Sequence, residues 1–510
     1  MQSRLLTLIV VLSLGACTAV NSPKRAVQSN TTDVGNAHNT ASVLQKGADA
    51  MRLVNEKNWP QAQVALQAVI QDKNFRSLPE DIQYRTLQTA GRVAAEHGEL
   101  PRGYEYFVRV TAFPEAGHDD WRNRLQAAAK LGNLADILSA LTLIMQRWPE
   151  DASQLSPDKI RRTLREAERL PHAATLPLLQ ALYNAHWKLR WHIEPSENWR
   201  DLTLQLLEKG RLSEANDVAG HVTDVYVLIA MRADRRFDTV VAANPEHFDI
   251  EAAGEREFRF LQSASESAPR SLELKSDVIQ ALLRRQHYEA ALAASDSVLS
   301  DIQSTNYPRE LFEDYDDQNS LFLNLRADAL ERVGRWDDAV AQLKVASLLR
   351  LGNDGYISQL TNLGWLYSDL GRPNDALTTV SGAEGHTSAF GTMQMEFVRL
   401  DAAIQLGASK QIESSLQYLR AHRADAPGAF QEALIGLNEL DQAAQVLIGR
   451  LLDTDQRQAA LQSVQDYAPR PEPQRSMDLD ARWRALIARP KVQAAIWKVG
   501  RVESHRLEEP

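Results

Sequence analysis

Two stretches of this chain carry the same pattern of residues. Residues 323–346 read LNLRADALERVGRWDDAVAQLKVA, and residues 360–383 read LTNLGWLYSDLGRPNDALTTVSGA. In each stretch apolar residues recur at helical spacing, a glycine interrupts them, and an alanine follows that glycine five residues later. Apolar residues three and four positions apart line one face of a helix, and a glycine after such a run ends it. Each stretch therefore predicts two helices joined by a tight turn.

The recurring small residues have a physical reason. Ala339 and Ala376 fall where the two helices of a pair are expected to cross, and a larger side chain there would push the helices apart. Gly334 and Gly371 fall at a helix end, where the chain needs a positive φ that costs glycine least. Because one helix pair cannot bury its apolar face alone, such pairs must stack on one another.

The pattern recurs along the chain. Residues 118–149 carry it in full, and weaker copies begin near residues 41, 84, 199, 279, 407 and 440. Gly132 follows Gly98 by 34 residues, which supports direct stacking of those two copies. These segments resemble tetratricopeptide repeats, with a generic helical bundle as the alternative. The resemblance implies an all-α solenoid, a right-handed superhelix of antiparallel helix pairs, whose concave groove is formed by the first helix of each pair.

The same resemblance assigns side chains to that groove, where protein partners would bind: Arg92, Arg122, Asn324, Asp328 and Trp365. Trp365 is the most informative of them, because a tryptophan at a position that is usually polar can anchor a partner. Its polar neighbours in sequence suggest the rim of a binding hot spot. The alternative is that Trp365 packs against the neighbouring repeat.

The spacing between copies is irregular, so we expect an interrupted solenoid. The pattern fades between residues 236 and 269, which suggests N-terminal repeats over 41–250 and C-terminal repeats over 251–466. Residues 467–510 depart from the repeat pattern. Terminal repeats often do so because one face meets water, so this part is expected to be a capping or a docking segment.

The N-terminal stretch has the features of an export signal. Arg4 precedes a short apolar run that is closed by Leu14-Gly15-Ala16-Cys17, and the run is too short to span a bilayer. The final four residues resemble the lipobox of bacterial lipoproteins. The resemblance implies that residues 1–16 are a signal peptide and that Cys17 becomes the lipidated N-terminus.

The residues that follow Cys17 bear on where the protein would lie. Thr18 stands where an aspartate would resemble an inner-membrane retention signal. This favours the periplasmic face of the outer membrane. Residues 17–40 show no apolar periodicity and are expected to form a disordered tether, since they cannot bury enough apolar surface to offset their ordering entropy.

The composition argues against several functional classes. The chain has a formal net charge of −10, with lysine and arginine scattered singly, whereas a nucleic-acid footprint needs a basic stripe. Cys17 is the only cysteine, so no internal disulfide can form. The twelve histidines include no HExxH helix, and we expect neither a metal nor a cofactor. The acidic run 313–317 lacks the glycine and closing glutamate of a calcium loop and is expected to be solvated.

These observations favour a non-enzymatic, membrane-anchored adaptor that binds protein partners in an envelope assembly. Pilus assembly, polysaccharide export, outer-membrane and cell-wall machinery all use lipoproteins that this chain resembles. The alternative is an enzyme, or an enzyme's regulatory domain, that acts on peptidoglycan or polysaccharide. Asp328 and Glu331 would then be the first candidates for paired acid–base work, because they share one face of a predicted helix.

The lipid anchor can be tested directly. Replacing Cys17 by Ser removes the thiol that lipidation requires, so we expect Cys17→Ser to abolish palmitate labelling and to leave the membrane fraction for a soluble or unprocessed form. Fractionation and metabolic labelling in a bacterial host measure both effects. A wild-type protein that takes up no label, together with unchanged fractionation of the variant, would contradict the anchor.

Overall fold

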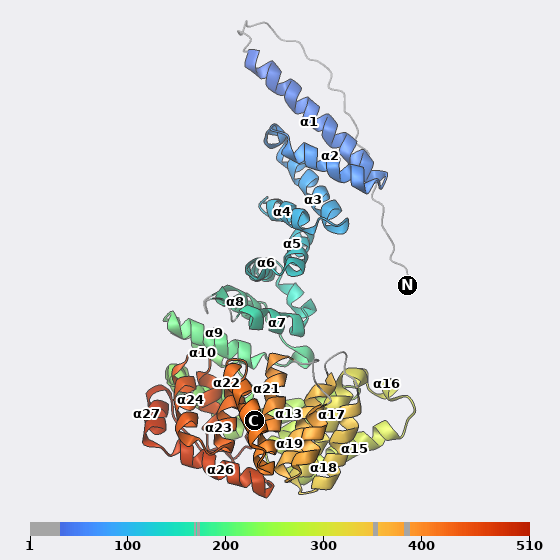
Figure 1. Cartoon of the computed structure of the whole chain (residues 1–510). Helices are drawn as coiled ribbons and strands as arrows, with labels where there is room; N and C mark the ends of the chain where they lie inside the picture. Colours follow the sequence, from blue (N-terminus) through green and yellow to red (C-terminus); the bar gives the residue numbers. More distant parts are fainter. Residues whose placement is uncertain (1–30, 168–169, 171–173, 350–354, 382–387, 510) are drawn as a thin grey trace. The chain divides into compact units, whose positions relative to one another are not determined.

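The structure is a computed structural model that describes residues 31–167, 170, 174–349, 355–381 and 388–509. The regular elements of these residues are helices (Figure 1). Two isolated β-bridges also occur. This confirms the all-α fold. Cys17, the expected signal peptide and most of the expected tether lie outside the described residues.

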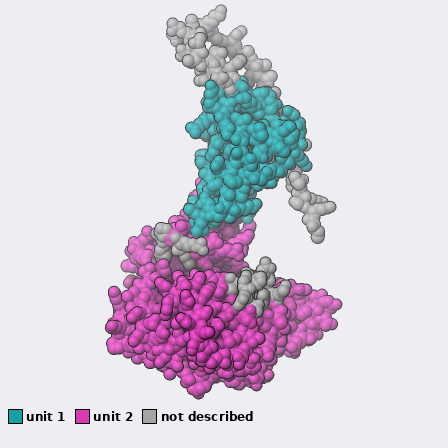
Figure 2. All heavy atoms as spheres, in the orientation of Figure 1, with its two compact units in different colours: residues 1–140 teal, residues 141–510 magenta. Residues whose placement is uncertain are grey.

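The chain divides into two compact units, residues 1–140 and 141–510 (Figure 2). The division does not fall near residue 250, where the fading repeat pattern suggested a joint. Residue 250 instead begins helix α13 (Ile250–Ser267), whose N-terminus is capped by the Asp249 carboxylate accepting from the amide of Ala252. This helix packs against α11 and α14 inside unit 2. The repeat signature residues are absent here, yet the helix forms because of its cap and its packing.

Unit 1 is built from consecutive helix pairs, and its last helix extends across the division. The helices are α1 (Thr31–Asn55), α2 (Trp59–Gln71), α3 (Glu80–Glu96), α4 (Leu100–Val110), α5 (His118–Leu131) and α6 (Leu134–Arg147). Helix α1 begins at Thr31, so residues 31–40 of the expected tether are helical. A helix that is already nucleated extends at one hydrogen bond per added residue, and α1 is held against α2 over its later turns.

Unit 2 continues the pairs and ends in helices outside the repeat pattern. Its first helices are α7 (Pro157–Ala167), α8 (Leu176–Asn184), α9 (Ser196–Glu208), α10 (Leu212–Ala219), α11 (Val225–Ala233), α12 (Asp238–Ala243), α13, α14 (Leu272–Arg284), α15 (Tyr288–Gln303) and α16 (Pro308–Leu311). The remaining ones are α17 (Tyr315–Arg332), α18 (Trp336–Leu348), α19 (Gly355–Asp369), α20 (Pro373–Ser381), α21 (Ala389–Leu406), α22 (Ser409–Ala421), α23 (Pro427–Gly436), α24 (Leu440–Leu452), α25 (Arg457–Ser463), α26 (Gln474–Ile487) and α27 (Pro490–Val499).

The two quoted stretches form the pairs α17–α18 and α19–α20, as predicted. Ala339 and Ala376 are fully buried at the crossings. Gly334 and Gly371 adopt φ values of +75° and +68°, the left-handed conformation that ends a helix. At Gly364 an added Cβ would lie 2.9 Å from Cγ1 of Val380, so the helices meet too closely for any side chain. The repeat frame is confirmed in both pairs.

In the acidic run 313–317, Glu313, Asp316 and Asp317 are exposed, as the sequence suggested, and Asp314 is the exception. Asp314 is buried, and its carboxylate accepts hydrogen bonds from the amides of Leu272 and Glu273 at 2.8 and 3.0 Å. It also accepts from the Ser271 hydroxyl at 3.0 Å. A carboxylate is favourable at a helix N-terminus because unpaired amides and the helix dipole both attract it. Asp314 therefore caps α14 from a distant part of the chain.

The last helices of unit 2 lie beside its early helices. Helices α26 and α27 pack against α24, and α25 packs against α11. A β-bridge joins Asp234, just after α11, to Gly500, just after α27. Residues 467–510 therefore pack on α24 and also connect to helices far back in the sequence.

Overpacking at a crossing tests the repeat frame. Ala339→Leu places a large side chain where the helices touch, and such substitutions cost about 1–3 kcal/mol of unfolding free energy. The matched control is Ala341→Leu, which lies two residues further along the same helix and is exposed. Urea unfolding followed by circular dichroism should show a loss for the first variant and little change for the second. Equal stability of the two variants would contradict the crossing.

Candidate functional site

Residues 464–509 run back across the first helices of the repeats in unit 2, and we call them the returning segment. Its helix α26 packs against α19, α23 and α24. Its last part, residues 500–509, reaches α11, α14 and α17. The side chains that lie beside it define the inner face: Arg284, Asp328, Glu331, Arg332, Asp369 and Asp401.

Glu508 is held through both its side chain and its backbone. Nε of Arg332 lies 3.0 and 3.2 Å from the two carboxylate oxygens of Glu508 and donates to them. The Glu508 amide donates to the carbonyl of Arg284 at 2.9 Å, and the Glu508 carbonyl accepts from the Tyr226 hydroxyl at 2.8 Å. Glu508 is only 4% exposed. Three helices thus hold one residue of the returning segment.

The residues before Glu508 form a short backbone ladder. Residues 503–507 run alongside residues 466–468, with a parallel β-bridge between Ser504 and Asp466. The Asp466 amide donates to the Glu503 carbonyl at 3.1 Å, and the His505 amide donates to the Asp466 carbonyl at 2.8 Å. The Ala468 amide then donates to the Leu507 carbonyl at 2.9 Å. This ladder pairs the two stretches, and the backbone bends at Arg506 and Leu507, just before Glu508.

Charged residues fix both ends of the returning segment. Arg232 of α11 donates two hydrogen bonds to the Glu503 carboxylate, at 2.7 and 3.0 Å. In α26, Arg475 pairs with the buried carboxylate of Asp401 on α21. Arg482 donates to the last carbonyls of α23, where the partial negative charge of a helix C-terminus favours a cation. The segment is therefore bound by charge as much as by apolar contact.

The inner face has an excess of carboxyl groups. Burial, and then the neighbouring Asp328, raise the pKa of Glu331, and burial likewise raises the pKa of Asp328. Arg332 and Arg470 act in the opposite direction on both groups, while the Glu508 carboxylate adds to the rise at Asp328. Burial and Asp401 raise the pKa of Asp369 to about 6. These carboxyls therefore hold protons at a higher pH than exposed ones do.

Asn324 and Asp328, which the sequence assigned to the groove, both lie on α17. Nδ2 of Asn362 on α19 donates to Oδ1 of Asn324 on α17 at 2.7 Å, so Asn324 links two neighbouring repeats. Asp328 lies beside Arg470 and Glu508 of the returning segment. Along α17, the face predicted to meet a partner thus meets a segment of the same chain.

Trp365 has different surroundings from those expected. It is half-buried, and its ring centroid lies 4.4 Å from that of Phe397 on α21, the next first helix. The polar surround is also different, because Ser368 is buried and donates to Asp401 at 2.6 Å. Trp365 thus packs against the neighbouring repeat, the alternative that the sequence had left open. Its role in partner binding stays a prediction.

Arg92 and Arg122 lie in unit 1, on α3 and α5, and both are exposed. The two helices are held in register by Asp120, which is buried. Its carboxylate accepts from Nε2 of Gln88 at 2.7 Å and from the hydroxyl of Tyr84, both on α3. It also caps its own helix by accepting from the Gly117 amide at 2.9 Å. This network fixes the spacing between the exposed rows of the two repeats.

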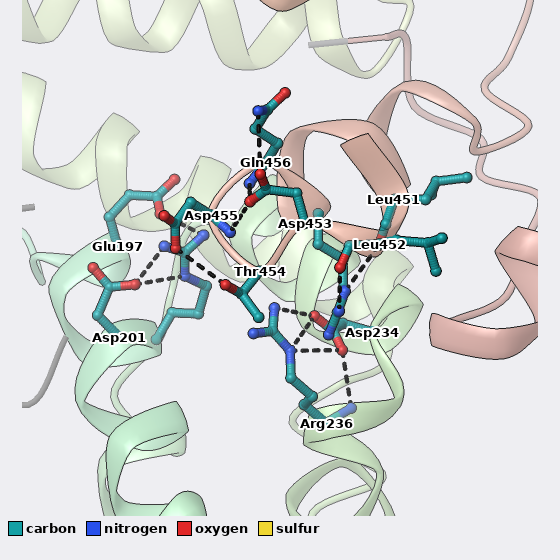
Figure 3. Close-up of polar contacts among 12 residues, drawn as sticks. Glu197, Asp201, Asp234, Arg236, Leu451, Leu452, Asp453, Thr454, Asp455 and Gln456 are labelled. Atoms are coloured by element: carbon teal, nitrogen blue, oxygen red, sulfur yellow. Dashed lines mark hydrogen bonds and ion pairs between the residues drawn. The ribbon is translucent and has the colours of Figure 1, made fainter. Parts of the chain in front are cut away.

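Unit 2 also contains a cavity of about 1390 Å³, which α9, α11 and the loop after α24 help to line. Figure 3 shows part of its wall, where loop residues 453–456 lie beside Glu197 and Asp201. Arg236 donates to the Asp234 carboxylate at 2.6 and 2.9 Å in the same wall. Arg200 pairs with both Glu197 and Asp201 in this wall.

The described residues contain no group of three or more histidine, cysteine, aspartate or glutamate side chains placed to hold a metal ion. None of the described helices combines the length and hydropathy that a membrane span needs.

Replacing Glu331 by Gln tests the electrostatics of the inner face. A carboxyl with a raised pKa keeps its proton in the folded state at pH values where the unfolded chain has lost it. Its stabilising contribution is therefore complete below the unfolded pKa of about 4.3 and is lost as the pH rises. We expect Glu331→Gln to gain thermal stability over wild type progressively between pH 5 and pH 8, measured by circular dichroism.

Glu289→Gln is the control for this experiment, because Glu289 is an exposed glutamate on α15. It should unfold at the same temperature as wild type across the whole range. A Glu331→Gln variant whose difference from wild type stays constant with pH, or reverses in sign, would contradict the raised pKa.

Comparisons with known proteins find structures of low overall similarity and no relative in sequence. No family model matches the chain, and no curated protein matches it. Similar solved structures include yeast Tom70, which is 11% identical with a TM-score of 0.34 and covers 90% of this chain and 99% of that one. The APC/C hetero-tetramer Cut9–Hcn1 is 11% identical, with a TM-score of 0.30 over 92% of this chain and 99% of that one.

A Rap protein in complex with competence and sporulation factor is likewise 11% identical, with a TM-score of 0.26 over 90% of this chain and 99% of that one. The assignment of a solenoid of tetratricopeptide-like helix pairs to this protein rests on its own crossings and turn glycines.

Proposed function

We propose that this protein is a non-enzymatic scaffold of the bacterial cell envelope. It is anchored through Cys17 to the outer membrane, faces the periplasm, and binds a protein partner through the exposed first helices of unit 1. The sequence resemblance to lipoproteins supports the anchor. The helix-pair architecture supports the binding role, because stacked pairs present a continuous surface to a partner.

The observation that carries the proposal is a row of exposed side chains that repeats between α3 and α5. Arg85 and Arg92 on α3 are exposed, as are Asp119 and Gln126, which follow them by the repeat length of 34 residues on α5. Arg122 lies in the same exposed region of α5. Within the described residues, Arg92 and Arg122 enter no ion pair. Exposed arginines on a rigid support are frequent anchors of protein interfaces.

Reversing these charges tests the binding surface. The double variant Arg92→Glu, Arg122→Glu should fold as wild type does and should lose the partners recovered by crosslinking in cells and affinity purification. Truncating or reversing a rim charge acts mainly on association, so the loss should be partial at high protein concentration. The control is Lys159→Glu, Arg162→Glu, two exposed basic residues of α7 in unit 2.

The outcome is judged on reproducible partners. Recovery of the same partners from the double variant and from the control would contradict the proposed surface. Recovery of no reproducible partner from the wild type would contradict the scaffold itself.

One observation favours the enzymatic alternative, in which unit 2 acts on peptidoglycan or polysaccharide. Asp328 and Glu331 form a carboxyl pair with raised pKa values, and such pairs serve as acid and base in glycoside hydrolysis. Against it, Glu508 of the returning segment already lies beside Asp328. Turnover of purified sacculi that is lost in Asp328→Asn would favour this alternative over the scaffold.

A further inference from the structure

The last part of the returning segment is bound in the way that a separate peptide would be bound. Residues 503–508 add no helix to the repeat stack. Their backbone is held by Tyr226, by the Arg284 carbonyl and by the ladder with residues 466–468. Main-chain hydrogen bonds of this kind give affinity for any extended chain, and side-chain pockets add specificity.

Three side chains of the segment supply that specificity. Arg232 pairs with Glu503, and Arg332 pairs with Glu508. Leu507, between them, is 7% exposed, and its Cδ2 lies 3.9 Å from where a Cβ on Gly254 of α13 would be. The face therefore selects two carboxylates five residues apart, the second of them preceded by a leucine.

We propose that the face formed by α11, α14 and α17 is a binding site for an extended acidic peptide, which residues 503–508 occupy within the same chain. A partner protein that carries a Glu-x₃-Leu-Glu segment would take this site by displacing them. This site differs from the surface of unit 1 that the proposed function uses, so the two can fail separately.

The charges around Glu508 make the occupied state exchangeable. Arg332 attracts the Glu508 carboxylate, but Asp328 on the same helix lies close enough to repel it. Charge pairs of this kind contribute less than their distance suggests, because each group has also lost water. The internal segment occupies the site in preference to a separate peptide mainly because it is tethered. Tethering corresponds to an effective concentration in the millimolar range. Weakening its contacts should therefore expose the site to a peptide added from solution.

The probe is a fluorescein-labelled peptide with the sequence of residues 499–509, VGRVESHRLEE, and the readout is fluorescence anisotropy. In the full chain, Glu508→Lys places a cation against Arg332 and should release the internal segment. We expect this variant to bind the peptide at least about 100-fold more tightly than wild type does, as expected once a tethered competitor is removed. Glu509→Lys makes the same charge change at the exposed neighbouring residue and should behave as wild type.

A charge swap tests the recognition itself. A probe with lysine in place of Glu508 should fail to bind Glu508→Lys. In Arg332→Glu the internal Glu508 faces a carboxylate and should be released. This variant should bind the lysine probe more tightly than it binds the wild-type probe. The proposal is overturned if folded Glu508→Lys binds the wild-type probe no more tightly than wild type does. It is also overturned if both probes bind Glu508→Lys equally.

Hydrogen exchange of the wild-type protein gives a second test that needs no variant. The amides of Arg501, His505 and Glu508, which donate to backbone carbonyls, should exchange faster than the buried amides of α17. Local opening of this kind is how a bound segment is released without unfolding the rest. Exchange at the same slow rate as α17 would show that the segment opens only with the whole unit, and would overturn the proposal even if Glu508→Lys did not fold.

Discussion

The close approach of paired helices is the constraint on which the rest of unit 2 depends. At Gly364 the first helix of one repeat lies so near Val380 of the second that no side chain fits between them. In the preceding repeat, the small side chain of Ala339 on α18 is fully buried at the crossing. This contact fixes the rotation of each first helix about its own axis. The rotation in turn decides which residues of α17 and α19 are presented to the returning segment.

The inner face shows what that rotation produces. Asp328, Glu331 and Arg332 lie within one turn of α17 and all meet the returning segment. Carboxyls outnumber arginines there, and the segment itself brings Glu508 together with Arg470 and Arg475. Neither the helices nor the segment is electrically balanced alone. The charge pattern on each is therefore intelligible only when the two are considered together.

Features that depend on local sequence could be predicted, and features that depend on distant residues could not. The pairs α17–α18 and α19–α20, with their turn glycines and crossing alanines, follow from spacing within about thirty residues. Asp314 gave no such signal, because its role is to cap a helix that begins 42 residues earlier.

The site follows the same rule. The sequence assigned Asp328 to a groove for a protein partner, and it gave no sign of Arg332 and Glu508, which are separated by 176 residues. No spacing rule links such residues. For Trp365 the sequence left a groove position and packing against the next repeat both open, because the neighbouring Phe397 could not be placed from one helix alone. The opposite charges of Arg332 and Glu508 were the one available signal, and opposite charges are too common in a sequence to be specific.

The ties between early and late residues of unit 2 have a consequence for how the protein is made. A solenoid normally needs only neighbouring repeats, so each pair can fold as soon as it has been synthesised. Tyr226 and Glu508 are 282 residues apart, and at about 5–20 residues per second that separation corresponds to roughly 15–55 s of translation. During this interval α11, α14 and α17 have been synthesised, but residues 503–508, which later cover them, have not. Incomplete chains that lack residues 503–508 therefore leave Tyr226, Arg232 and Arg332 without the groups that they bind in the finished protein.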